Sequence, residues 1–116
     1  MTPLPLDAIA HLRPGSEIDR FVHVLVLGLP DEENRSDYPC YSETTGALIL
    51  LSAVPVSVGR YRETDPEFGR ERPFFGTFTV GPIQDPKTYT FKCATPELAL
   101  CKAALAYITV AGRPPR

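Results

Sequence analysis

Arginines and aromatic residues gather in the segment GRYRETDPEFGRERPFF, which runs from residue 59 to residue 75. An arginine offers a planar fork for phosphate or carboxylate, and an aromatic ring offers a face on which a base can stack. The pattern therefore favours recognition of an anion or a nucleotide. The candidate ligand-binding residues are Arg60, Tyr61, Arg62, Arg72, Phe74, Tyr89 and Lys92. Acidic residues lie between the arginines, so a solvated connection whose acids neutralise its bases is the alternative.

The sequence contains residue types that can bind a metal, but they lack the spacing of known metal sites. The three cysteines and two histidines form neither a C-x2-4-C nor an H-x3-5-H pair, and structural zinc sites nearly always contain such pairs. The acids at 31–33 lack the spaced ligands and turn glycine of a calcium loop. The candidate ligands are Cys40, Cys93, Cys101, His11 and His23. We expect none of them to bind a metal, and we expect the thiols of Cys93 and Cys101 to be buried in the core.

Catalytic signatures are equally scarce. The chain contains no G-x-S-x-G, no P-loop and no G-x-G-x-x-G, and no histidine stands in a context that suggests a general base. General acid–base and covalent catalysis both need an activated group. We therefore expect no catalytic residue and no cofactor, and a protein that is not an enzyme.

The overall composition is typical of one soluble globular domain. The chain has 116 residues, a formal net charge of −2 and 43% hydrophobic residues. The acidic balance argues against nucleic-acid binding, which usually needs a basic surface. The apolar stretches are shorter than the ~20 residues of a membrane span. No signal-peptide pattern opens the chain, so the expected location is the cytoplasm, with reduced cysteines.

The 13 prolines divide the chain into predicted elements. We expect an N-terminal arm over 1–15 with one short turn. A helix follows over 16–28, with Ser16 as N-cap, Asp19 at N3 and Gly28 as the stop signal. After an acidic loop, a second helix capped by Ser42 is expected to run until Pro55.

Residues 54–93 change to a period of two, which predicts strands. In the segment 54–62, Val58 and Arg60 share one face. In the segment 73–81, Phe74, Phe78 and Val80 lie opposite Phe75, Thr77 and Thr79. In the segment 88–93, Tyr89, Phe91 and Cys93 lie opposite Thr88, Thr90 and Lys92. Turn-rich connections between these segments predict an antiparallel meander with one buried face.

The closing helix begins with Thr95 as N-cap and Pro96 at N1. The element order α–α–β–β–β–α predicts an α+β single-domain sandwich, in which helices pack a three-stranded or slightly larger antiparallel sheet. Residues 1–116 would form one domain, with an arm over 1–15, the sandwich over 16–110 and a C-terminal tail over 111–116.

The closing helix carries almost no charge between Pro96 and Ala111. One apolar stripe, formed by Leu98, Cys101, Leu105 and Ile108, is expected to cover the sheet. A second apolar set then needs a cover from the first two helices or from another subunit. That candidate interface comprises Leu100, Ala103, Ala104 and Tyr107.

Three stretches resemble a known family. The segments RPGSEIDRFVHVLVLG, YSETTGALILLSAV and ATPELALCKAAL are similar, in order and spacing, to motifs of the phage and prophage "ABA sandwich" domain. The resemblance covers roughly residues 13–107 and departs from the family pattern at 22–25. It implies a phage-associated cytoplasmic sandwich domain, and it supplies no catalytic residue.

Two classes of function follow from these observations. We expect a small phage-type accessory protein that acts by binding, through a host protein or as a homo-oligomer. The alternative is a small-ligand binder that sequesters a host nucleotide signal. The order α–β–β–β–α is also that of a double-stranded-RNA-binding domain, but its last helix here opens with an acid and has no base before Lys102.

Overall fold

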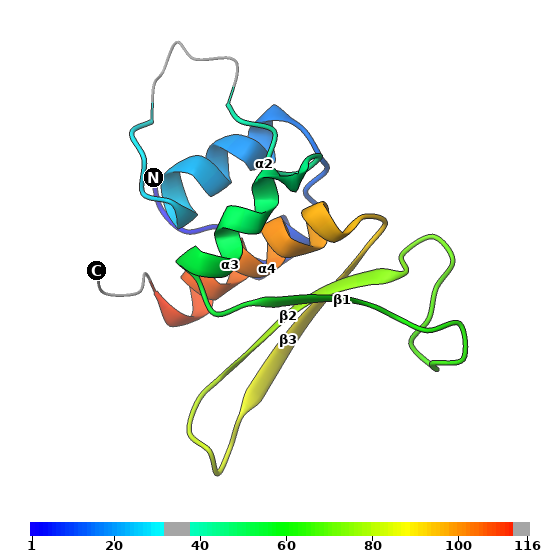
Figure 1. Ribbon diagram of the computed structural model, residues 1–116. Coiled ribbons are helices and arrows are strands. Elements are labelled where there is room, and N and C mark those ends of the chain that lie inside the picture. The colour runs from blue at the N-terminus through cyan, green and yellow to red at the C-terminus, as the bar shows by residue number, and fades with distance from the viewer. Residues whose placement is uncertain (32–37, 113–116) are drawn as a thin grey trace.

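The computed structural model describes residues 1–31 and 38–112. Helix α4 (Pro96–Ala111) lies between a three-stranded antiparallel sheet and a layer of short helices (Figure 1). The sheet has the order β1 (Ser57–Arg60), β2 (Phe74–Val80) and β3 (Lys87–Cys93). The short helices are α1 (Leu6–Ala10), α2 (Ser16–Phe21), the π-helical η1 (Val22–Val26), the 3-10 helix η2 (Thr45–Ile49) and α3 (Leu50–Ala53). The predicted α+β class is confirmed.

The strand register confirms the predicted alternation. Gly76 pairs with Val58 on one side and Phe91 on the other, and Phe75 pairs with Gly59 and Lys92. Residues paired across strands share a face of the sheet, so the predicted faces are correct. Strand β1 is shorter than the predicted segment 54–62.

Helix α4 contacts the sheet through small residues. A Cβ atom added at Gly76 would lie 2.2 Å from the Ala99 carbonyl oxygen and 3.0 Å from the Ala103 Cβ atom. Farther along the helix, the Tyr107 ring meets the Phe78 ring edge-on, with centroids 5.5 Å apart. Glycine in the strand and alanine in the helix thus let the two backbones approach closely.

The prediction that the Leu98–Ile108 stripe covers the sheet is therefore wrong. Residues Ala99, Ala103 and Tyr107 face the sheet, and at 3.6 residues per turn the predicted stripe lies on the opposite side of the helix. Almost every α4 side chain from Leu98 to Ile108 is buried. Because the helix is apolar on all sides, periodicity alone cannot select the face that meets the sheet.

The two serines predicted as N-caps do not cap helices. Gly15 occupies the N-cap position of α2 without a side-chain hydrogen bond, and Thr44 caps η2 by accepting from the Gly46 N–H. Ser42 is buried instead, where its Oγ accepts from the Gly15 N–H (3.1 Å). Its own N–H donates to the Asp19 carboxylate (2.9 Å). Ser42 thus connects to the start of α2 through Gly15 and Asp19.

The first 15 residues belong to the helical layer. Ile9 of α1 is fully buried in the core. The Lys102 ammonium donates to the Ala10 carbonyl oxygen (2.8 Å), and the Thr109 hydroxyl donates to the Leu4 carbonyl oxygen (2.6 Å). The predicted arm is therefore packed against α4. At the other end, α4 begins as predicted with Thr95 as N-cap and Pro96 in its first turn. Residues 113–116 of the predicted tail lie outside the described residues.

Candidate functional site

The predicted ligand-binding residues are divided between the two faces of the sheet. The Arg60 guanidinium lies over the Phe74 ring on the face that α4 covers, 5.8 Å from the ring centroid. Tyr61 packs on Phe75 with ring centroids 4.5 Å apart, and the Lys92 ammonium lies 5.6 Å from the centroid of Tyr61. These three residues form a cluster on the open face.

Tyr89 belongs neither to the Arg60–Phe74 pair nor to the cluster on the open face. Its ring stacks on Phe78 with centroids 5.1 Å apart, on the α4 side of β3. The cations and aromatic rings that the sequence singles out therefore do not converge on one point.

Two acidic side chains of the connection between β1 and β2 have local partners, which are Lys92 of β3 and a backbone N–H of the connection. The Lys92 ammonium donates to the Glu67 carboxylate at 2.6 Å, and this hydrogen bond raises the pKa of Lys92. The backbone N–H of Arg62 donates to the Asp65 carboxylate at 2.7 Å. An open hollow of about 470 Å³ lies against this connection; its lining contains Glu67 and Glu71 as well as Arg70, Arg72 and Lys92. The mixed lining resembles a solvated surface more than an anion site.

The predicted interface residues are mostly interior. Leu100, Ala103 and Ala104 are buried within the single chain, and Tyr107 is half-buried against Phe78. The helices and the sheet of the same chain supply the cover that α4 needs. The first three residues are therefore unavailable to a second subunit, and any contact surface must lie elsewhere.

The candidate metal ligands are dispersed. Within residues 1–31 and 38–112, no three histidine, cysteine or acidic side chains gather as a metal site would require. The His11 Nδ1 donates to the Asp7 carbonyl oxygen (2.7 Å), and the buried His23 is hydrogen-bonded to the Tyr41 hydroxyl (3.0 Å). Glu32 and Glu33 of the acidic loop lie outside the described residues.

The cysteines differ in environment. Cys93 and Cys101 are buried with free thiols, and Cys40 is exposed. Burial, with a smaller contribution from the Asp19 carboxylate, raises the pKa of Cys101 to about 12. Burial also raises the pKa of Cys93. Both interior thiols are therefore protonated and unreactive at neutral pH, as expected for core cysteines.

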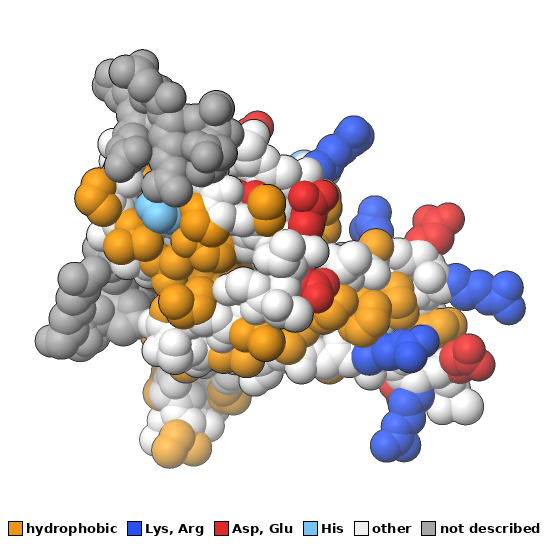
Figure 2. Space-filling view, turned by 45° about the horizontal axis from the view of Figure 1, so that its top comes forward, with side chains coloured by type: hydrophobic (Ala, Val, Ile, Leu, Met, Phe, Trp, Pro, Cys, Tyr) orange, Lys and Arg blue, Asp and Glu red, His pale blue; other side chains and the backbone are white. Residues whose placement is uncertain are grey.

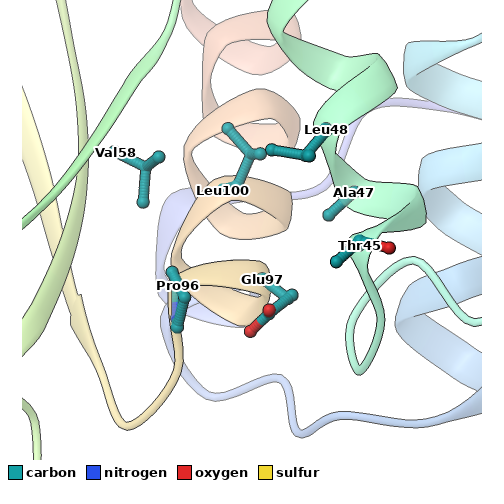
Figure 3. Close-up of a pocket in the computed structure, with 7 residues that line it drawn as sticks. All are labelled: Thr45, Ala47, Leu48, Val58, Pro96, Glu97 and Leu100. Atoms are coloured by element: carbon teal, nitrogen blue, oxygen red, sulfur yellow. The ribbon is translucent and has the colours of Figure 1, made fainter.

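A small apolar pocket opens where η2, β1 and the first turns of α4 meet (Figure 3). Its volume is about 80 Å³, and Ala47, Leu48, Val58 and Leu100 supply its apolar wall. Leu48 and Val58 come from opposite sides toward Leu100, and Glu97 lies at one end (Figure 3). Glu97 is the one charged residue of the lining. The pocket is thus a largely apolar site with one carboxylate at its end.

Exposed apolar side chains continue this surface along η2 and α3. Leu48, Ile49 and Leu51 expose 57%, 52% and 43% of their area. Hydrophobic side chains also gather over the helices in the space-filling view (Figure 2). We name Leu48, Ile49 and Leu51, together with the pocket, the η2–α3 surface. The sequence did contain a signal for it, since GALILLSA is too apolar for a helix with one solvated face.

In the described ranges, no helix combines the length and the apolar character that crossing a membrane requires.

Comparison with known proteins identifies the fold. No family model matches the chain, and no curated protein matches it. A crystal structure of a phage protein from Bacillus cereus ATCC 14579 superposes with a TM-score of 0.57 and 16% sequence identity. The match covers 85% of this chain and 90% of the Bacillus protein. The chain is therefore similar in fold to a phage protein.

Proposed function

We propose that this chain is a phage or prophage accessory protein that acts by binding another protein or another copy of itself, without catalysis. Two observations support the phage origin. The fold resembles that of the Bacillus cereus phage protein over most of both chains. The segments around 13–28, 41–54 and 94–105 resemble the "ABA sandwich" motifs, so we also propose membership of that family.

The observation that carries the binding function is the η2–α3 surface. Three large aliphatic side chains in four consecutive positions are about half exposed, beside an apolar pocket. Isolated exposed leucines are ordinary, but contiguous apolar patches mark contact surfaces. The patch has room for a side chain rather than a nucleotide, because the pocket holds only about 80 Å³. Protein–protein contact therefore fits it better than ligand sequestration.

The test compares two apolar-to-charged substitutions. Sedimentation velocity over a concentration series should show self-association of the wild type, which Leu48→Glu should abolish. Ile83→Glu is the matched control, because Ile83 is 97% exposed and lies outside the η2–α3 surface. A wild type that stays monomeric at the highest concentration would exclude self-association. Equal behaviour of the two variants would remove the η2–α3 surface from the proposal.

A further inference from the structure

We propose that two copies of the chain pair antiparallel through the outer edge of β1, with Arg60 of each copy facing Glu97 of the other. The inference rests on the self-association part of the proposed function and specifies its geometry. It uses three features that are otherwise unexplained: the outer edge of β1, the η2–α3 surface beside it, and two charged side chains, Arg60 of β1 and Glu97 of the pocket, that have no ion pair among the described residues.

The outer edge of β1 carries available hydrogen-bonding groups. The Tyr61 N–H donates to the Pro73 carbonyl oxygen (2.8 Å), and Gly59 pairs with Phe75 two residues earlier. Because antiparallel strands alternate, the N–H and C=O groups of Val58 and Arg60 point away from β2. Among the described residues, no strand pairs with that edge. An edge of this kind is a template for another strand.

The apolar η2–α3 surface lies beside this edge. Leu48 and Val58 line the same pocket, and Leu51 follows Leu48 by about one helical turn. In Figure 1, α3 crosses in front of α4 and leads into β1. A stable interface buries roughly 800 Å² per partner, which a four-residue strand cannot supply alone. The half-exposed aliphatic side chains supply additional area next to the strand.

One antiparallel register pairs the outward N–H and C=O groups of Val58 and Arg60 in both copies. A two-fold axis at Gly59 places Val58 opposite Arg60 of the second copy, so that the outward groups of both residues pair. Moving the axis to Val58 would bring Arg60 opposite Val56. That alternative loses a donor, because the Val56 N–H is already bound to the Val54 carbonyl oxygen (2.9 Å).

The charges are complementary in the Gly59-centred register. Residues opposite one another share a face, so the second copy's Arg60 side chain lies beside Val58 on the α4 side. Glu97 lines the pocket to which Val58 contributes. Among the described residues, Glu97 has no ion pair or hydrogen-bonded side-chain partner, and Arg60 has only its contact with Phe74. The two-fold symmetry creates the Arg60–Glu97 pair twice.

The opposite edge of the sheet is less suited to self-pairing. Strand β3 is longer, but it carries Lys87 and Lys92, and both are exposed. Lysines on an edge strand discourage pairing with another chain. The one charged residue of β1 is Arg60, which the Gly59-centred register places beside Glu97 of the second copy.

A charge-exchange experiment tests the geometry. The dimer dissociation constants of the wild type, Arg60→Glu, Glu97→Arg and the double variant are measured by sedimentation equilibrium. Each single variant places like charges together at two sites, so we expect weakening on the order of 10- to 100-fold. The double variant should recover most of the affinity. Lys87→Glu is the control, because Lys87 is exposed and lies on β3, at the opposite edge of the sheet. Circular dichroism of each variant establishes that it is folded.

The outcomes separate the inference from the proposed function. If the wild type associates but the single variants do not weaken it, or the double variant does not recover, the β1 pairing is wrong and self-association stands. If the wild type is monomeric at all concentrations, both the pairing and self-association are overturned.

Discussion

At the level of single residues, Asp31 has the best-defined ionic environment. Arg20 donates from Nε to Oδ1 (2.9 Å) and from Nη2 to Oδ2 (2.6 Å), and the Tyr38 hydroxyl donates to Oδ1 (2.9 Å). The hydrogen bonds from Arg20 are the main cause that lowers the pKa of Asp31 to about 2. The group ties the last turn of α2 to Asp31 of the acidic loop and to Tyr38.

This environment predicts a pH dependence. Since the folded pKa of about 2 lies below the ordinary value of 3.8, the Asp31 pair stabilises the fold fully above about pH 4. That contribution is lost as the pH falls toward 2. A carboxyl-detected NMR titration should give a midpoint near 2, and Arg20→Gln should move it toward 3.8. Glu17→Gln on the same helix should leave the midpoint unchanged. A wild-type midpoint near 3.8 would contradict the assignment.

The three cysteines predict a labelling pattern. Cys40 is exposed, whereas burial raises the pKa values of Cys93 and Cys101. A thiol-reactive chromophore at pH 8 should therefore label one cysteine per folded chain rapidly, and three after denaturation. In Cys40→Ser, rapid labelling of the folded protein should disappear. Rapid labelling of a second thiol would show that the core opens at Cys93 or Cys101.

At the level of elements, the packing of β2 on α4 depends on Gly76. In Gly76→Ala, the new methyl group would meet the backbone carbonyl of Ala99, which can yield only if the helix and sheet separate. We expect the free energy of unfolding to fall by about 1–3 kcal/mol. Urea denaturation followed by circular dichroism measures the change.

Gly69→Ala is the matched control for this prediction. An added Cβ atom at Gly69 meets nothing within 4 Å, so the same substitution should change stability by less than about 0.5 kcal/mol. Comparable losses in the two variants would mean that close packing at Gly76 is not the cause.

Elements with strong local signals were predictable from the sequence. Strands β2 and β3 follow from period-two alternation, and the start of α4 follows from Thr95 and Pro96. The serine caps were not predictable in the same way. Ser42 has the right type and position for a cap, but it bonds to the Gly15 N–H, 27 residues away. A capping serine and a serine in a long-range hydrogen bond look identical in sequence.

At the level of the whole molecule, α4 is the core around which both layers are assembled. Its side chains contact the sheet on one side, and Lys102 and Thr109 hold the N-terminal segment on the other. This arrangement explains why the helix lacks a polar face. Lys102, the one base in the helix, is itself largely buried, and burial lowers its pKa.

The N-terminal segment should therefore contribute to global stability. Ile9→Ala removes a fully buried side chain from α1 and should lower the free energy of unfolding by about 2–5 kcal/mol. Ile83→Ala makes the same chemical change at a side chain that is 97% exposed, and should cost less than about 0.5 kcal/mol. Thermal unfolding of both variants measures the difference. An Ile9→Ala variant as stable as the wild type would show that α1 is detached in solution.

The candidate site was only partly predictable from the sequence, because the exposure of an apolar residue depends on tertiary packing. The sequence drew attention to Arg60 through its arginine-rich context, and to the apolar closing helix. It could not indicate that Leu100 and Ala103 would be covered by the same chain while Leu48 and Leu51 remain exposed. Both sets are apolar, and exposure depends on which elements happen to pack against them.

The sequence by itself determined the α+β class, the faces of the strands and the limits of the closing helix, because alternation and capping act between residues close in the chain. The tertiary structure decided the rest. It selected the alanine side of α4 for the sheet, because only there can the helix approach Gly76 closely. It also placed the β1 edge, Leu48 and Glu97 together, since contacts between distant segments depend on the assembled layers and not on local pattern.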